Sequence, residues 1–187
     1  MPDEKQSLHF CPKCGLPFKT EDNLSLHIAN WHSDESNKKQ GNSKQTDPAK
    51  LLWQELVHRI FKTPDGFQGL SESEKRYFAV NILIGEVYNG GFHQFFFNNS
   101  GSYYKYVILG LEELGATQSL ALLQRAKLVL FENENMPEYV GKRREVILQR
   151  KSDDCLQLLN ELDKQFYKDP DGLDTKCVTY AKLHDLL

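Results

Sequence analysis

Four potential zinc ligands near the N-terminus constrain the fold of this chain more than any other feature. Cys11 and Cys14 are separated by two residues, His27 follows after twelve more, and His32 follows after a further four. Two cysteines across a tight turn and two histidines about one helical turn apart can close a tetrahedron around Zn²⁺. The spacing predicts a structural site with no open coordination position, in a segment whose folding depends on the metal.

Two apolar residues stand where a small zinc module needs its core. Phe18 follows the second cysteine by four residues, and Leu24 precedes the first histidine by three. With the four ligands, they make residues 8–33 resemble the C2H2 zinc-finger family. The resemblance implies a ββα module that holds one structural Zn²⁺. His9 stands where the family usually has an aromatic residue, with Phe10 beside it, which bears on the packing of the first strand rather than on the metal.

Side chains near the start of the helix contact base edges in the fingers that recognise DNA. The corresponding residues here are Thr20, Asn23 and Leu26. Asparagine can bond adenine, but leucine offers no polar contact. Glu21 and Asp22 add negative charge where phosphates would lie. Because a single finger also buries little surface, protein contact or stabilisation of the N-terminus is favoured over sequence-specific DNA binding.

Composition divides the rest of the chain into a linker and a second domain. Residues 34–47 contain no large apolar residue, which predicts a flexible linker, whereas residues 48–187 regain apolar periodicity. Residues 51–187 carry 16 Lys and Arg against 19 Asp and Glu, and such a near-neutral domain is not typical of proteins that coat nucleic acid. No apolar run is long enough to cross a membrane and nothing directs secretion, so we expect an intracellular protein, cytoplasmic or, in a eukaryote, nuclear.

The second domain is predicted to be an all-α helical domain. Asp47 would cap a first helix, and Ser71 to Glu74 has capping-box spacing before a buried helix that ends at Gly90 and Gly91. Further helices are expected over 102–114, from a Thr117 cap to Phe131, over 141–166, and over 175–187. The expected core residues of the helix that starts at Thr117 and of the 141–166 helix are Leu120, Leu123, Leu128, Phe131, Val146, Leu156, Leu159 and Leu162.

The most distinctive stretch is Asn89 to Gly101, NGGFHQFFFNNSG, preceded by VNILIGEV at 80–87. This stretch closely resembles a helical family whose named member is a bacterial DNA-mimic protein. The resemblance covers most of residues 50–165 and implies an all-α domain that can form a homodimer. A DNA mimic displays carboxylates at phosphate-like spacing, whereas this domain has few excess acids, so the fold could be shared without the charge pattern.

Two interpretations of the stretch remain open. In the favoured one, the glycines turn the chain, the phenylalanines form core, and the asparagines and serine cap a turn. In the other, a partner-contact surface or ligand pocket is formed by Asn89, His93, Gln94 and Asn98. Glu86, one helical turn before this stretch, is expected to make a structural hydrogen bond.

No catalytic set accompanies these features, because Cys155 and Cys177 lack a reactive-thiol pattern and no phosphate loop or nucleophile motif is present. The leading interpretation is a non-enzymatic interaction protein, in which a structural zinc finger is tethered to a helical domain that binds a protein. One alternative is a nucleic-acid-binding regulator that uses Thr20 and Asn23 of the finger and the basic cluster from Lys142, Arg143 and Arg144 to Lys151. The others are a DNA mimic that binds a DNA-binding protein, and an enzyme with its site near Asn89 to Asn98.

Overall fold

The computed structural model describes residues 9–10, 17–18, 47–132 and 135–187. Near the N-terminus, strands β1 (His9–Phe10) and β2 (Pro17–Phe18) pair antiparallel, with His9 opposite Phe18 and Phe10 opposite Pro17. The predicted features that lie outside the described residues are Cys11, Cys14, His27, His32, Thr20, Asn23 and nearly all of the 34–47 linker.

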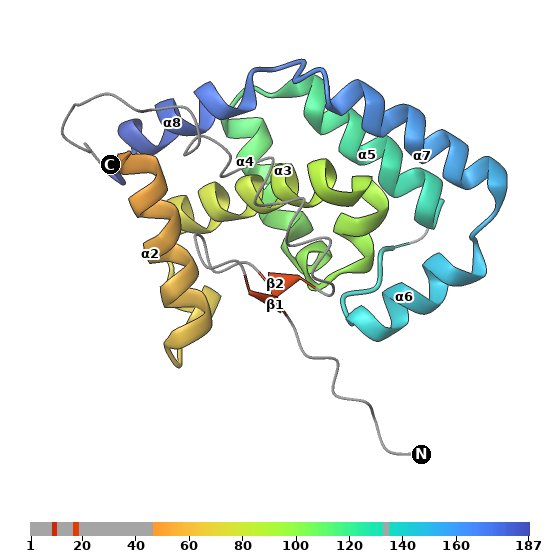
Figure 1. Cartoon of the computed structure of the whole chain (residues 1–187), viewed down its shortest axis with the longest axis horizontal. Helices are drawn as coiled ribbons and strands as arrows, with labels where there is room; N and C mark the ends of the chain where they lie inside the picture. The colour runs from red at the N-terminus through yellow and green to blue at the C-terminus, as the bar shows by residue number, and fades with distance from the viewer. Residues whose placement is uncertain (1–8, 11–16, 19–46, 133–134) are drawn as a thin grey trace, which may run out of the picture. The chain divides into compact units, whose positions relative to one another are not determined.

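Beyond residue 46, every described element is helical, which confirms the all-α prediction for this part of the chain (Figure 1). The described residues divide into two compact units, one that ends at Leu70 and one that spans Ser71–Leu186. The helices in chain order are α2 (Pro48–Lys62), η2 (Gly66–Gly69), α3 (Glu72–Phe97), η3 (Asn99–Tyr103), α4 (Tyr104–Glu113), α5 (Thr117–Phe131), α6 (Val140–Gln149), α7 (Asp153–Phe166) and α8 (Leu173–Leu183).

In the first unit, α2 begins as the sequence predicts. The side chain of Asp47 accepts a hydrogen bond from the backbone N–H of Ala49 at 3.0 Å, which satisfies one of the free donors at the helix start. At the other end, Arg59 Nη2 donates to the carbonyl oxygen of Gly69 at 3.2 Å. This bond ties α2 to the short helix η2.

The second unit is built around α3, which packs against α4, α5, α6, α7 and α8. Its start is the predicted capping box: the Glu74 N–H donates to Ser71 Oγ, and the Ser71 N–H donates to Glu74 Oε2. Because α3 contacts helices on several sides, it is apolar around most of its circumference. Its fully buried side chains, each with no more than 1% exposure, are Phe78, Ala79, Val80, Leu83, Val87, Phe92, Phe95 and Phe96.

Gly90 and Gly91 kink α3 rather than end it, which corrects the predicted helix end. The backbone leaves helical geometry at both residues, and helical geometry resumes at Phe92. Gly91 has a φ of 73°, in the left-handed region that favours glycine. The predicted turn at the glycines is present, and the aromatic residues after it form a second short helical segment.

Several later boundaries differ from the prediction. The expected 141–166 helix is two helices, because Arg150 ends α6 and Ser152 caps α7 through a hydrogen bond from the Cys155 N–H. Ala116, not Thr117, is the N-cap of α5. The last helix starts at Leu173 and ends at Leu183, and the expected 102–114 helix starts with the 3-10 turn η3.

The core predictions for α5 and α7 were partly wrong. Leu123, Phe131, Leu159 and Leu162 are buried as predicted. Leu128 is 48% exposed and Leu156 is 37% exposed, so neither is a core residue. The two remaining predicted core residues, Leu120 and Val146, are half-buried.

Candidate functional site

The kink in α3 creates a second helix start inside the protein, and a carboxylate from another helix caps it. Asp163 Oδ1 in α7 accepts from the backbone N–H of Phe92 at 2.8 Å. Burial raises the pKa of Asp163, and the Phe92 N–H acts in the opposite direction. A Cβ at Gly91 would lie only 2.7 Å from Asp163 Cγ. The second glycine therefore allows both the turn and the close approach of the capping carboxylate.

A polar cluster joins the two halves of α3 and the turn after it. Glu86 accepts hydrogen bonds from Gln94 Nε2 at 2.7 Å, from Asn98 Nδ2 at 3.0 Å and from Ser100 Oγ at 2.9 Å. This confirms the structural hydrogen bond predicted for Glu86. Two of the four residues predicted to form a surface or pocket, Gln94 and Asn98, are thereby bound to an internal carboxylate.

Arg143 closes the end of α3 from the other side. Its guanidinium is 0% exposed, and all five donor positions find acceptors. Nε donates to Phe96 O at 2.7 Å, Nη2 to Asn98 O and Ser102 Oγ, and Nη1 to the carbonyls of Pro137 and Glu138. Backbone carbonyls at a helix C-terminus carry partial negative charge, so they compensate the buried cation in place of a carboxylate.

Gly101 is part of the same arrangement, because a Cβ there would lie 2.9 Å from Arg143 Nε and 3.0 Å from Phe96 O. The glycine at the end of the NNSG segment thus makes room for the guanidinium. The prediction of Arg143 as a nucleic-acid contact was wrong, since a fully buried side chain cannot reach a phosphate. In sequence alone, Arg143 is indistinguishable from the two basic residues beside it.

The rest of the predicted basic cluster is not one continuous charged surface. Lys142 pairs with Glu145 at 3.0 Å, and Arg150 pairs with Glu132 at 3.4 Å. Arg144 donates through Nε to Phe97 O at 2.8 Å, and its guanidinium lies 5.1 Å from the centre of the Phe97 ring. Lys151 is exposed.

The other two residues of the predicted surface lie apart from the Glu86 cluster. His93 stacks on Phe97, with ring centroids 5.5 Å apart and planes inclined by 15°. Burial, followed by the charge of Lys151, lowers the pKa of His93, so its imidazole is neutral at neutral pH. Asn89 is half-buried, and none of the described residues hydrogen-bonds its side chain. The structure therefore does not bring the four predicted residues into one pocket.

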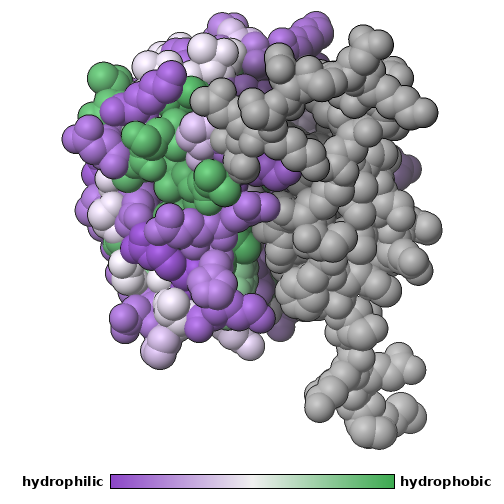
Figure 2. Space-filling model, turned by 60° about the vertical axis from the view of Figure 1, so that its left-hand side comes forward, coloured by the Kyte–Doolittle hydropathy of each residue, from purple (hydrophilic) through white to green (hydrophobic). Residues whose placement is uncertain are grey.

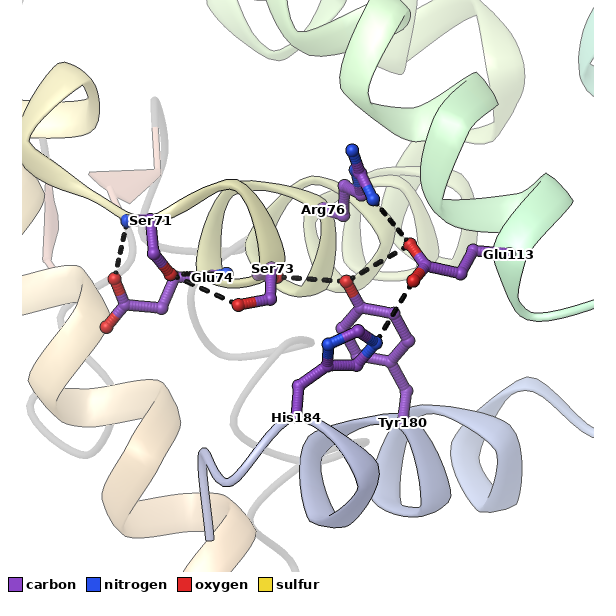
Figure 3. A network of polar contacts seen from close by, with 7 residues as sticks. All are labelled: Ser71, Ser73, Glu74, Arg76, Glu113, Tyr180 and His184. Carbon is purple, nitrogen blue, oxygen red and sulfur yellow. Dashed lines mark hydrogen bonds and ion pairs between the residues drawn. The ribbon is translucent and has the colours of Figure 1, made fainter.

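A second polar network, which the sequence analysis missed, joins α3, α4 and α8 (Figure 3). Glu113 accepts from Arg76 Nη1 at 2.7 Å, from His184 Nε2 at 3.0 Å and from Tyr180 Oη at 3.4 Å. Burial alone would raise the pKa of Glu113, but the hydrogen bond and charge of Arg76 outweigh it and lower the pKa. Burial and the charge of Glu113 raise the pKa of Tyr180 to about 12. No local spacing could reveal this cluster, because its members come from three helices.

Two other aspartates near the C-terminus accept backbone N–H groups at helix starts, one from a distant helix and one from the adjacent helix. Asp171 Oδ2 accepts from the Ser119 N–H of α5 at 2.6 Å, and Asp169 Oδ1 accepts from the Leu173 N–H of α8 at 2.8 Å. Among the described residues, no group of three or more His, Cys, Asp or Glu side chains is placed to hold a metal ion. Burial raises the pKa of the Cys177 thiol to about 12, so it stays protonated at neutral pH.

Hydrophobic residues gather in limited areas of a largely hydrophilic surface on the face drawn in Figure 2. Independently, α5 and α7 pack side by side, and a groove of about 210 Å³ lies between them. Leu128 is 48% exposed and Leu158 is 50% exposed in this groove. The full lining is Arg125, Leu128, Val129, Leu158, Glu161, Leu162 and Gln165. We call it the α5–α7 groove.

None of the described helices is both long and apolar enough to span a lipid bilayer. Together, the fold and the polar clusters define a helical protein whose distinctive motif serves mainly to hold its own helices together. Residues 68–184 match the family described as DMP19-like protein, and the chain belongs to this family. Comparisons with curated proteins and with solved structures found no match.

Proposed function

We propose that this chain is a non-enzymatic interaction protein, and that the α5–α7 groove is where its helical domain binds a protein partner. The observation that carries the proposal is the exposure of Leu128 and Leu158, each about half exposed, beside the charged and amide groups of Arg125, Glu161 and Gln165. A groove with an apolar floor and a polar rim fits the apolar face of an amphipathic helix. The DMP19-like family, with its DNA-mimic character, supports a protein as the partner.

The polar residues of the distinctive motif support an interaction protein over an enzyme. A catalytic carboxylate or amide needs free capacity toward a substrate. Here Glu86 already accepts from three side chains, and Gln94 and Asn98 are two of its donors. The motif is therefore used to fix the end of α3, and the α5–α7 groove is the surface that we propose contacts other molecules.

A DNA mimic is the second candidate, because the family resemblance favours it. In this candidate the partner would be a DNA-binding protein. The charge pattern is less favourable, since Asp163, Asp169 and Asp171 each accept a backbone N–H inside the fold. If duplex DNA competed with the helical domain for binding to the partner, mimicry would be favoured. A partner with no affinity for DNA would rule mimicry out.

The N-terminal residues are proposed to hold one structural Zn²⁺ through Cys11, Cys14, His27 and His32. The ligand spacing supports this, as does the antiparallel pairing of β1 and β2 on either side of Cys11 and Cys14. A hairpin in that position presents two thiolates from its turn. Elemental analysis should find about one zinc per chain, and the Cys11→Ser, Cys14→Ser variant should contain none. A metal-free wild-type protein would contradict the proposal.

The groove can be tested by site-specific photo-crosslinking in cells. A photoreactive phenylalanine in place of Leu158 should give a cross-link to a protein. The same photoreactive residue in place of Tyr139, which is 75% exposed, should give no cross-linked product of that mass. Adding Leu128→Asp should abolish the cross-link without unfolding the domain, since Leu128 is half exposed. Equal cross-linking from both positions would refute the groove, and a cross-link only to a second copy of the chain would make it a homodimer interface.

A further inference from the structure

Arg144 is fixed in place by contacts that leave most of its donors free. Nε donates to Phe97 O at 2.8 Å, and the guanidinium lies over the Phe97 ring. His93 stacks on the same ring. Within the described residues, no group accepts a hydrogen bond from Nη1 or Nη2 of Arg144. Arginine loses side-chain entropy when it binds an anion, so a guanidinium that is already oriented binds at lower cost.

A second unpaired cation and an exposed apolar residue lie next to Arg144. Leu148, four residues later on the same face of α6, is 57% exposed. Lys151, three residues beyond and just after the end of α6, is exposed, and no carboxylate of the described residues pairs with it. By contrast, the neighbouring cations Lys142 and Arg150 are paired with glutamates. We call Arg144, Leu148 and Lys151, beside His93 and Phe97, the cationic face.

The chemistry of the cationic face fits an acidic protein segment better than a nucleic acid. Arg144 presents a fork that matches a carboxylate. Leu148 lies between the two cations in the sequence, and a phosphodiester backbone would gain nothing from contact with its apolar side chain. The Phe97 ring already packs against His93 and Arg144, so it is not free to stack on an unpaired base. Two carboxylates separated by an apolar side chain complement this arrangement.

From this complementarity we infer that the cationic face binds an acidic segment of a protein, with an apolar residue of that segment against Leu148 and carboxylates on Arg144 and Lys151. This surface is separate from the α5–α7 groove and does not depend on it. It also gives His93, one of the residues that the sequence singles out, a place at the edge of an interface. Binding should weaken as salt is added, because both ion pairs would be partly exposed to solvent.

The full-length protein can be titrated into a fluorescent peptide of repeated Glu-Glu-Leu units, with fluorescence anisotropy as the readout. Saturable, salt-sensitive binding is expected, and a peptide of Gln-Gln-Leu units should not bind. Lys151→Glu should weaken binding by roughly tenfold or more, and Leu148→Ser should weaken it as well. Both residues are exposed, so neither change should unfold the protein; Lys105→Glu, an exposed charge reversal on α4, is the matched control.

Three results would overturn the inference. The first is no binding of the acidic peptide at low salt. The second is a Lys151→Glu protein that binds the peptide as tightly as the wild type. The third is a random DNA duplex that binds more tightly than the peptide through the same residues. Leu128→Asp in the α5–α7 groove should leave peptide binding unchanged. Failure of the groove proposal and failure of this one are therefore distinguishable.

Discussion

Gly91 carries the clearest single-residue constraint in the domain. Its φ of 73° disfavours a side chain, and a Cβ would meet the Asp163 carboxylate. Gly91→Ala should destabilise the fold by roughly 1–3 kcal/mol, measured by urea denaturation. Gly85→Ala in the same helix is the control, since a Cβ there has no neighbour within 4 Å; it should stabilise by about 0.5–1 kcal/mol. Equal effects of the two changes would contradict this account of the kink.

Arg143 is the second decisive residue, because removing it leaves five acceptors without their donor. Arg143→Met should lower the free energy of unfolding by about 3 kcal/mol or more, since the Phe96 carbonyl is left buried and three further carbonyls are left part-buried without a donor. Lys142→Met, one residue away and exposed, should change it by no more than about 0.5 kcal/mol. Comparable losses for the two variants would show that the buried guanidinium does not hold the end of α3.

The sequence predicted individual residues well where a local rule applied. Asp47, Ser71 and Glu74 form the predicted caps, and Glu86 forms the predicted structural bond. Prediction from the sequence failed where the surroundings of a side chain are formed by segments distant in the chain. Nothing in Lys142-Arg143-Arg144 shows which of the three enters the core, since that depends on where the carbonyls of Phe96 and Asn98 lie.

At the scale of elements, helix existence was easier to predict than helix ends. The break between α6 and α7 was missed, although Ser152 followed by Asp153 and Asp154 is a helix-start pattern. The apolar residues continue across the break with nearly helical spacing, and this continuity outweighed the capping signal. Leu128 and Leu156 were assigned to the core for the same reason, since periodicity shows that a helix has an apolar face but not where its neighbours stop covering it.

The Glu113 network gives the helix packing a defined pH dependence. The folded-state pKa of Glu113 lies below its ordinary value of 4.5, so its contribution to stability is complete above that value and is lost as the pH falls through the folded-state pKa. Between neutral pH and about pH 3, the free energy of unfolding of the wild type should therefore fall by about 1 kcal/mol more than that of the Glu113→Gln protein. Urea denaturation at both pH values measures this, with Glu112→Gln as the control. A Glu113→Gln protein with the same acid sensitivity as wild type would contradict it.

At the scale of the whole molecule, the ion pairs between described side chains remain partly open to water and contribute little. Lys142 and Glu145 both have largely exposed side chains, and in the pair of Arg59 with Glu55 the glutamate is exposed while the arginine is partly buried. Arg143, which is fully buried, uses uncharged partners instead. Raising the salt concentration from about 0.05 M to about 1 M NaCl should therefore change the free energy of unfolding by less than about 1 kcal/mol. Calorimetry at both concentrations would test this, and a much larger loss at high salt would mean that surface charge holds the fold together.

The bond from Asp163 to the Phe92 N–H spans 71 positions of the chain, which has a consequence for synthesis on the ribosome. Residues 92–97 leave the ribosome well before α7 exists, so the second half of α3 must wait for its cap. Contacts of such long range close late and slow folding. A nascent chain released before α7 would keep its first capping box intact and yet expose the aromatic half of its central helix to the proteins that bind unfinished chains.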